Sequence, residues 1–313
     1  MYTIMKKFCS SLLIFCILIS FPISAAAKGI NSESEQKIYN DIRLAVERKE
    51  TSVNLGYYVL QADDKETQEE LVRIFRQVLC DNPLYFYVKE NTIRLSVINF
   101  LGIKFVGLMK FEIDYDTYNI QKMTKKLKEE ITNAKNYVEK KNAATDYEII
   151  ETLYDYLITT VKYDTELQNV NNNNAYGALV DKNAVCYGYA KAYILLLKSY
   201  GIKSDIAYSE KMEHAWAVIN YRDNWYNIDP TWDSQFSSND NISHNNFLKS
   251  DDEFKQLGHY SWFSNVACDK AFVMPTDFFI IKKTDLSPND FIFISRETRN
   301  QKIYRILFSL KKR

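Results

Sequence analysis

Glycine, proline and histidine are scarce in this chain of 313 residues, and neither sign of charge is in excess. The sequence holds 8 Gly, 5 Pro and 3 His, while 40 Lys and Arg balance 40 Asp and Glu. Because Gly and Pro mark turns and loops, their scarcity argues against long linkers and favours helices. A net charge of zero lacks the basic excess that attracts nucleic acids, so we expect no nucleic-acid partner.

Short metal-binding motifs are also lacking, since the sequence contains no CxxC and no HxxxH. Structural zinc sites use four Cys or His ligands at such spacings, so we expect no metal, and we expect no other cofactor. The hydrophobic content of 46% is ordinary for a globular protein. The length fits one large or two modest domains. Twenty-three Tyr, with many Lys, Asn and Ile, favour a bacterial origin.

The first 27 residues have the organisation of a secretory signal peptide. Lys6 and Lys7 precede an apolar stretch over residues 8–21, and Ala25 and Ala27 are the small residues expected before a cleavage point. The apolar stretch is shorter than the roughly 20 residues with which a helix crosses a membrane. We therefore predict cleavage and a secreted or cell-wall-associated protein. An uncleaved anchor, through which alone the chain would contact a membrane, is the alternative.

Cleavage would leave three cysteines and a net charge of −2. Cys80, Cys186 and Cys268 remain, and 38 basic residues then face 40 acidic ones. An odd count leaves at least one thiol outside any disulfide. Either Cys80 pairs with Cys268 or all three are reduced, because the sequence does not give the distance that a disulfide requires.

Hydrophobic periodicity divides the rest of the chain into three parts. We predict an N-terminal α/β domain over residues 28–142, a second domain over 143–270 and a β-rich extension over 271–313. The helices predicted in the first domain lie at 32–50, 66–80 and 117–141. The strands predicted there lie at 51–60, 85–88, 93–98 and 105–113, and those of the extension at 278–281, 291–295 and 303–310.

The second domain begins with a capping box. Thr145 and Glu148 stand three positions apart before an apolar helical pattern, so their side chains can satisfy each other's unpaired backbone N–H groups. Four asparagines at residues 171–174 then predict a loop, because Asn favours turns.

The segment NAVCYGYA, residues 183–190, places a cysteine where an apolar run becomes helical. Asn183 is a good N-cap, which puts Cys186 in the first turn of a helix that Gly201 ends. Unpaired N–H groups in a first turn stabilise a thiolate, which is the nucleophilic form of cysteine. A buried structural cysteine is the alternative, because free Cys is among the most buried residue types.

Two predicted strands downstream carry a histidine and an aspartate. His214 lies on the strand at residues 213–220 and Asp229 on the strand at 225–229, with a turn at 221–224 between them. Counting from the turn places both near the same rung and on the same face, where a hydrogen bond is possible. A one-residue change of register would place them on opposite faces. Taken singly, His214 is equally well a core histidine and Asp229 a turn cap.

Together, Cys186, His214 and Asp229 provide the nucleophile, the base and the orienting group that acyl transfer requires. A metal site built from the same three side chains has less support, because a fourth ligand at short spacing is missing. His244 and His259 lie in a polar, loop-rich segment, so we expect both at the surface.

Three blocks within residues 145–233 resemble the motifs of the transglutaminase-like superfamily, in the papain-like class of cysteine enzymes. In the family's order they are AVCYGYAKAYILLLKSYGI, HAWAVI and NWYNIDPTWD, and residues 245–251 resemble the family's tail. The resemblance implies an α+β fold in which a helix bearing the Cys packs on an antiparallel sheet. It implies that Cys186 is the nucleophile, His214 the base and Asp229 the orienting residue. Tyr187 departs from the pattern, since many relatives have Gln or another polar residue there, and this leaves substrate preference open.

The activity that follows is acyl transfer through a Cys186 thioester on protein or peptide amides, cell-wall peptides included. An amine acceptor makes the reaction a transamidation, and water makes it the hydrolysis of a peptidase or amidase. A non-catalytic protein that binds the cell wall is the third hypothesis.

Four aromatic residues are candidates for substrate binding. Tyr187 follows the nucleophile, and Tyr176 is a candidate second oxyanion donor beside the N–H of Cys186. Trp216 and Trp232 either line a tunnel that excludes water or are core aromatics, and the large area that Trp buries favours the core.

Overall fold

The computed structural model describes residues 32–237, 241–273, 279–281, 292–296 and 303–307. The predicted signal peptide lies outside these residues. The chain forms two compact units, which divide between Lys270 and Ala271. In the part of the chain that is described, no helix is both long and apolar enough to span a membrane.

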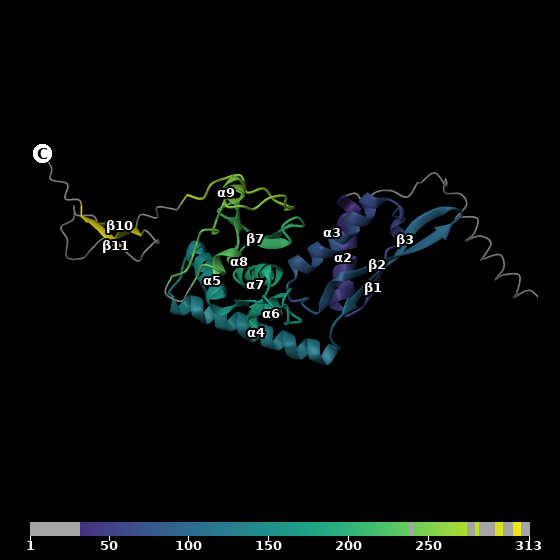
Figure 1. Cartoon of the computed structure of the whole chain (residues 1–313), viewed down its shortest axis with the longest axis horizontal. Coiled ribbons are helices and arrows are strands. Elements are labelled where there is room, and N and C mark those ends of the chain that lie inside the picture. The colour runs from purple at the N-terminus through teal and green to yellow at the C-terminus, as the bar shows by residue number, and fades with distance from the viewer. Residues whose placement is uncertain (1–31, 238–240, 274–278, 282–291, 297–302, 308–313) are drawn as a thin grey trace, which may run out of the picture. The chain divides into compact units, whose positions relative to one another are not determined.

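The first unit begins with two helices and a three-stranded antiparallel sheet of order β1-β3-β2 (Figure 1). The side chains of α2 and α3 that recur at helical spacing, such as Ile38, Ile42, Leu71 and Phe75, are buried. The elements are α2 (Ser32–Glu47), β1 (Ser52–Asn54), a 3₁₀ turn η1 (Gly56–Tyr58), α3 (Lys65–Asp81), β2 (Val88–Phe100) and β3 (Ile103–Ile113).

The predicted helices of this region are present, but the predicted strands are partly wrong. The strand expected over residues 51–60 ends at Asn54, because the 3₁₀ turn follows and Val59 has a left-handed backbone with φ 53°. Residues 85–88 and 93–98 were expected as separate strands, yet Val88–Phe100 forms one long strand with a register shift between Lys89 and Arg94. The irregular pairing there interrupts the alternation on which the prediction relied.

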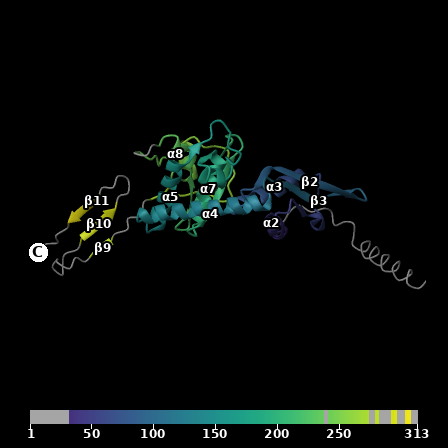
Figure 2. The ribbon, with the colours of Figure 1, turned by 90° about the horizontal axis from the view of Figure 1, so that it is seen from below.

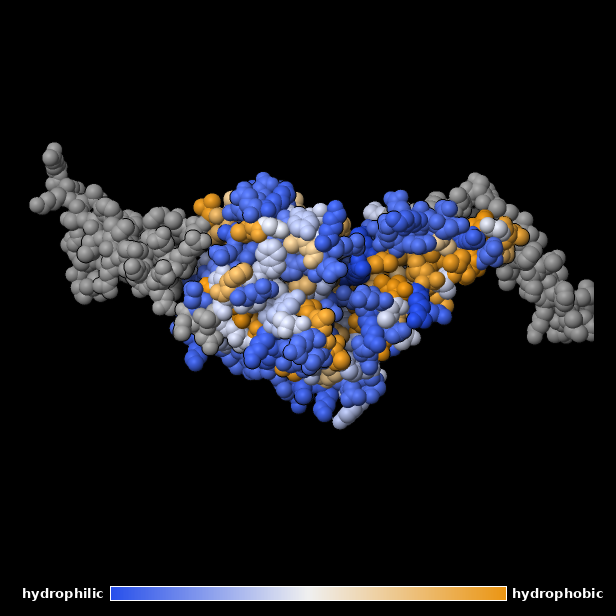
Figure 3. Space-filling model, viewed as in Figure 1, coloured by the Kyte–Doolittle hydropathy of each residue, from blue (hydrophilic) through white to orange (hydrophobic). Residues whose placement is uncertain are grey.

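Exposed apolar side chains gather on the β2–β3 hairpin (Figure 3). Val97, Ile98, Phe100 and Leu101 are between 44% and 76% exposed. Single exposed apolar residues are ordinary, but four within five positions form a patch.

Helix α4 (Thr117–Lys140) lies along α5 (Asp146–Thr160), as the view from below shows (Figure 2). The predicted capping box at the start of α5 is confirmed. The Thr145 side chain accepts from the N–H of Glu148, whose carboxylate accepts from the N–H of Thr145. Two unpaired donors at the helix start are thereby satisfied.

The centre of the unit is α7 (Cys186–Lys198), which packs on an antiparallel sheet of order β6-β7-β8. Eleven of its thirteen residues are buried, so it is a core helix without a solvated face. The strands are β6 (Ser204–Ser209), β7 (His214–Tyr221) and β8 (Asn224–Ile228). A helix that begins with a cysteine and covers an antiparallel sheet confirms the expected α+β fold.

Glycines let a loop close tightly on the start of α7. The carbonyl of Asn172 accepts from the N–H of Val185, just before the helix. A Cβ at Gly188 would lie 2.2 Å from that Asn172 oxygen, so no larger side chain fits. The loop connects β4 (Lys162–Tyr163) to α6 (Ala175–Leu179), and β4 pairs in parallel with β5 (Asn183–Ala184).

The remaining elements complete the two units. Short helices α8 (Pro230–Ser234) and α9 (Asp251–Gln256) follow the sheet in the first unit. The second unit contains an antiparallel sheet of order β11-β10-β9, formed by β9 (Phe279–Ile281), β10 (Ile292–Arg296) and β11 (Ile303–Leu307). These strands lie at the three places where strands were predicted after residue 271.

Replacing Gly188 with Ala should destabilise the protein by about 2 kcal/mol, because the added methyl group overpacks the contact with Asn172. Chemical denaturation measures this change. Gly201→Ala is the matched control at the other end of α7. Its φ of 75° disfavours Ala, by about 1 kcal/mol, but a Cβ there meets no atom within 4 Å. A loss of stability in Gly188→Ala no larger than that in Gly201→Ala would contradict the overpacked contact with Asn172.

Candidate active site

Cys186 lies in the first turn of α7, as expected, but it is the first residue of the helix, because the N-cap is Val185 and not Asn183. Asn183 is held in β5, where it pairs with Lys162, so it cannot also adopt the position of a cap. The capping residue offers no side-chain acceptor. The N–H groups of the first turn have no intrahelical partner and remain directed toward the space before the helix.

His214 and Asp229 form a direct hydrogen bond between Nε2 and Oδ2, 2.7 Å long. Their predicted contact is therefore present, but the predicted rung is wrong. Ala217 pairs with Ile228, and continuing this register puts Asp229 across from Trp216, two residues beyond His214. The predicted register is thus wrong by two residues. Because successive side chains alternate between the two faces of a sheet, an error of two leaves both side chains on the same face, and they still make contact.

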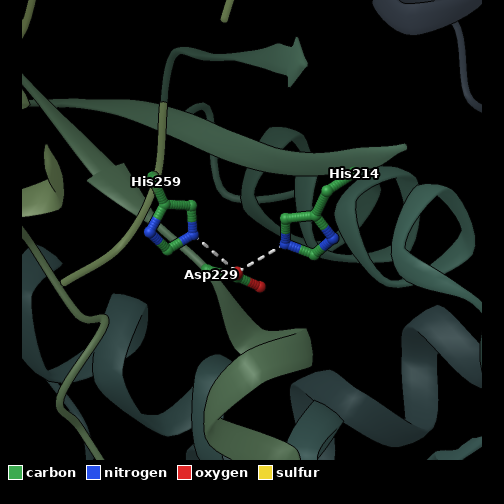
Figure 4. Close-up of side chains that lie close together, drawn as sticks. All are labelled: His214, Asp229 and His259. Atoms are coloured by element: carbon green, nitrogen blue, oxygen red, sulfur yellow. Dashed lines mark hydrogen bonds and ion pairs between the residues drawn. The ribbon is translucent and has the colours of Figure 1, made fainter. Parts of the chain in front are cut away.

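Asp229 is completely buried and accepts four hydrogen bonds. Its Oδ1 accepts from the N–H groups of Thr231 and Trp232, which makes it the N-cap of α8. Its Oδ2 accepts from His214 and also from Nε2 of His259, at 3.1 Å. Figure 4 shows the two imidazoles approaching the carboxylate from opposite sides. Four donors offset the large cost of burying this charge.

The backbone of Asp229 is fixed as well. The Tyr154 hydroxyl donates to the Asp229 carbonyl at 3.0 Å and is also 2.6 Å from a carboxylate oxygen of Asp233. Asp233 in turn accepts from the N–H and the side-chain amide of Asn246. Helix α5 and the segment after α8 therefore hold the turn in which Asp229 lies.

Nδ1, the second nitrogen of His214, is available to interact with Cys186. Because a carboxylate only accepts, Nε2 must carry the hydrogen, and neutral His214 then has an accepting Nδ1. Nδ1 points away from Asp229 in Figure 4. Cys186 interacts with the His214 ring, and its Sγ lies 3.9 Å from the carbonyl of Glu213. Both side chains are nearly closed to solvent, with Cys186 5% and His214 8% exposed.

His214 and Asp229 each stabilise the charged form of the other. Burial alone would lower the pKa of His214, but the charge and hydrogen bond of Asp229, with a smaller contribution from Cys186, raise it to about 10. Burial would raise the pKa of Asp229, yet His214 and His259 lower it to about 2. Asp229 therefore stays ionised and stabilises the imidazolium that forms when Nδ1 of His214 takes a proton.

Aromatic rings enclose His214. Trp232, which is partly exposed, stacks on the imidazole with centroids 5.6 Å apart and an interplanar angle of 28°. Trp216 is fully buried, and its indole N–H donates to Asn227. Trp216 is therefore a core aromatic, whereas Trp232 remains partly exposed beside His214.

The other two predicted substrate-binding residues, Tyr187 and Tyr176, lie near Glu90 and Phe86, around the start of β2. Tyr187 lines a cavity of about 350 Å³ together with Glu90 and Lys191. Tyr176 packs on Phe86 with ring centroids 5.3 Å apart. Their roles in substrate binding stay predictions.

Tyr163 is a site residue that the sequence analysis missed. Burial, with the charges of Cys186 and Asp229, raises its pKa, so it lies within electrostatic range of both. It is exposed on β4, and β4 comes into place only through its pairing with β5. A two-residue strand gives no periodic signal from which this position can be predicted.

The expectation that His259 lies at the surface is wrong. The side chain is 1% exposed and contacts Asp229 from a segment 30 residues downstream. His244 is only partly exposed and pairs with Asp155 at 2.8 Å. The polar composition of the segment misled the prediction, because Trp216 and Trp232, which pack against the imidazole, come from elements distant in the sequence. The only feature of the sequence that pointed to a role for His259 was the scarcity of histidine, with three in the chain.

All three described cysteines are free thiols, so Cys80 and Cys268 are not paired. Burial raises the pKa of both thiols well above the usual range. Neither is therefore a candidate nucleophile at neutral pH.

His214, Asp229 and His259 offer a set of ligand atoms within 4.8 Å of one another. The separations of 2.7 and 3.1 Å between nitrogen and oxygen are those of hydrogen bonds. Around a tetrahedral zinc ion with bonds near 2.0 Å, two ligand atoms would lie about 3.3 Å apart. The cluster therefore fits a hydrogen-bonded network better than a metal centre.

Replacing Asp229 with Asn should make stability less dependent on pH. The stabilisation from the raised pKa of His214 is complete below its unfolded value of 6.5 and is lost as the pH rises through about 10. That from Asp229 is present above 3.8 and is lost as the pH falls through about 2. The difference in Tm between wild type and D229N should be largest between pH 3.8 and 6.5 and shrink toward pH 10.

Asp155→Asn is the matched control, since Asp155 pairs with the partly exposed His244. Solvent screening should make its effect smaller. A difference in Tm between wild type and D229N that stays constant over this range would contradict the charged pair.

Residues 127–230, from within α4 to the first residue of α8, match the family model of the transglutaminase-like superfamily. The match includes Cys186, His214 and Asp229, and it ends before His259. It confirms the resemblance of this region to that superfamily.

Two solved structures are similar over part of the chain. One is a TGase, at 13% identity and a TM-score of 0.31, over 44% of each chain. The other is a "Putative Cysteine Protease from Cytophaga hutchinsonii", at 16% identity and a TM-score of 0.28, over 44% of this chain and 62% of that one. The chain thus covers less than two thirds of either. A search of curated proteins found no match.

Proposed function

We propose that this chain, whose residues 127–230 form a transglutaminase-like domain, is a cysteine-dependent enzyme that transfers acyl groups from protein or peptide amides to amines. One observation carries the proposal. Cys186 begins a buried helix beside His214, whose other nitrogen is bonded to a buried carboxylate. The three side chains are thus arranged as nucleophile, base and orienting group, with the base between the other two, as acyl transfer requires.

In the first half of the reaction, Nδ1 of His214 takes the proton of the Cys186 thiol. The sulfur then attacks the amide carbonyl carbon, and a C–S bond forms as the carbonyl π electrons move to oxygen. The N–H of Cys186, at the start of α7, is placed to donate to that oxygen. His214 returns the proton to the leaving nitrogen, the C–N bond breaks and a thioester remains. Asp229 stays ionised and stabilises the imidazolium.

In the second half, an amine attacks the thioester carbonyl carbon, His214 takes the proton that the amine loses, and the C–S bond breaks to release the Cys186 thiolate. A cavity of about 460 Å³ beside Tyr163 supports an amine as the acceptor. Its lining includes the carboxylates of Asp164, Glu166 and Asp181, which favour an ammonium group over an anion. The partly exposed Trp232 over His214 supports the exclusion of water.

The same reaction centre serves a hydrolase if water enters in place of the amine. The full chain, under reducing conditions, should couple a fluorescent primary amine to a glutamine-rich protein with release of ammonia. Cys186→Ala should abolish the coupling, because no thioester can form. Fluorescence retained on the denatured protein and an ammonia assay give the two rates.

Cys80→Ala is the matched control, since Cys80 is a buried free thiol outside the site, and it should retain activity. Ammonia or fragment release that depends on Cys186 but incorporates no amine would identify water as the acceptor. Equal incorporation by wild type and Cys186→Ala would overturn cysteine-dependent catalysis.

We also propose that the enzyme acts outside the cell or at the cell wall, on the basis of the signal pattern in residues 1–27. Expression in a secreting bacterial host should yield a medium fraction whose first residue is Lys28. Intact-mass analysis and N-terminal sequencing measure this. Lys6→Glu with Lys7→Glu should reduce export by removing the basic region. A mature protein that retains Met1 would contradict cleavage.

A further inference from the structure

His259 is brought to Asp229 by a short capped helix. Ser250 and Glu253 form a capping box at the start of α9, and Gly258, with φ 105°, reverses the chain at its end. The N–H of His259 then donates to the carbonyl of Phe254 at 3.0 Å. These contacts place the imidazole in the core although the surrounding sequence is polar.

The hydrogen bonding of His259 defines its tautomer. Its Nε2 lies 3.1 Å from Oδ2 of Asp229, the same oxygen that accepts from His214 (Figure 4). Its Nδ1 is buried and has no hydrogen-bond partner among the described residues. Because a carboxylate only accepts, the hydrogen bond to Asp229 requires a hydrogen on Nε2.

Stacking holds the ring in this orientation. The centroids of Trp232 and Phe254 each lie 4.0 Å from that of His259. Trp232 also stacks on His214, so one indole contacts both histidines. A phenyl ring would satisfy this packing equally well, and the donor on Nε2 is what only the histidine supplies.

We propose that His259 is a positioning residue for acyl transfer at Cys186. By donating to Oδ2 of Asp229 it holds the carboxylate against His214 and moderates the attraction of that carboxylate for the proton of His214. The inference rests on the proposed function of the site and adds a fourth residue to it.

The physical basis is competition for one oxygen. A donor bonded to a carboxylate stabilises its charge and lowers its basicity, so Asp229 remains ionised and pulls less on the imidazolium. His214 must both accept the thiol proton and release it to the leaving nitrogen, which works best when its basicity is moderate. The titratable groups facing His214 are Cys186 from α7, Asp229 after β8 and, through that carboxylate, His259. Tyr163 on β4 is within electrostatic range of Cys186 and Asp229.

Three variants of the full chain separate the hydrogen bond from the packing. His259→Phe keeps an aromatic ring and removes the donor. His259→Gln places an amide N–H near the position of Nε2. His244→Gln is the matched control, because His244 also pairs with a carboxylate, Asp155, but outside the site.

Two rates are measured from acid to alkaline pH: amine incorporation, and alkylation of Cys186 by iodoacetamide followed by peptide mass spectrometry. In His259→Phe we expect kcat to fall about tenfold, while KM stays within about twofold of the wild-type value. A loss of this size is typical when the hydrogen-bond partner of a metal-bound imidazole is removed. The alkaline inflection of both profiles, which reports the His214 proton, should rise by about one pH unit. His259→Gln should restore both, and His244→Gln should match wild type.

An unchanged kcat and pH profile in a folded His259→Phe would overturn the proposal, even with a lower Tm, because the residue would then only fill space. Failure of His259→Gln to restore the profile would also overturn it. Alkylation needs no acyl substrate. A His259-dependent alkylation profile without turnover would therefore overturn the proposed function and support the positioning role.

A measurement on the wild-type protein keeps the proposal testable if His259→Phe does not fold. ¹⁵N NMR of labelled histidine should find hydrogen on Nε2 of both His214 and His259 at neutral pH. Hydrogen on Nδ1 alone of His259 would overturn the proposal, because Nε2 could not then donate to Asp229.

Discussion

The buried carboxylate of Asp229 is the constraint on which the site depends. An ionised group without solvent is tolerated only when it is hydrogen-bonded and paired, and this one receives four hydrogen bonds. The donors come from β7, from the first turn of α8 and from the residue after Gly258. Segments that are distant in sequence must therefore assemble before the charge is stable. Because a partly assembled site would leave the buried carboxylate without some of its donors, the complete arrangement is the stable one.

The position of Cys186 follows from the same network. His214 is oriented by Asp229, and α7 is held against β7 by a core in which nearly all of its residues are buried. The loop packs closely on Gly188 in the first turn of the helix, where its Asn172 carbonyl leaves no room for a Cβ. A nucleophile placed this way loses little entropy when a substrate binds, because its surroundings are already ordered.

The choice between an amine and water as acceptor depends on what surrounds this centre. In the proposed enzyme the nucleophile, base and carboxylate are common to both reactions, so we infer that the exposed Tyr163, the partly exposed Trp232 and the carboxylates near β4 distinguish them. Trp216 contributes to the core instead, where its N–H is satisfied by Asn227. In the proposed enzyme, the residues that select the acceptor are therefore separate from the three that carry out the reaction.

The sequence by itself determined the elements that short-range patterns encode and the three residues that the family motifs carry. The capping box at Thr145 and the presence of Cys186 in the first turn of a helix follow from local patterns, because caps and helical periodicity extend over only a few residues. The shared face of His214 and Asp229 follows from the parity of the count across the turn, which an error of two does not change. Only the tertiary structure decided that Asn183 is a strand residue, that Tyr163 is within electrostatic range of Cys186 and that His259 is buried against Asp229. Those positions depend on strand pairing and on packing against rings from other elements, and neither leaves a periodic signal in the local sequence.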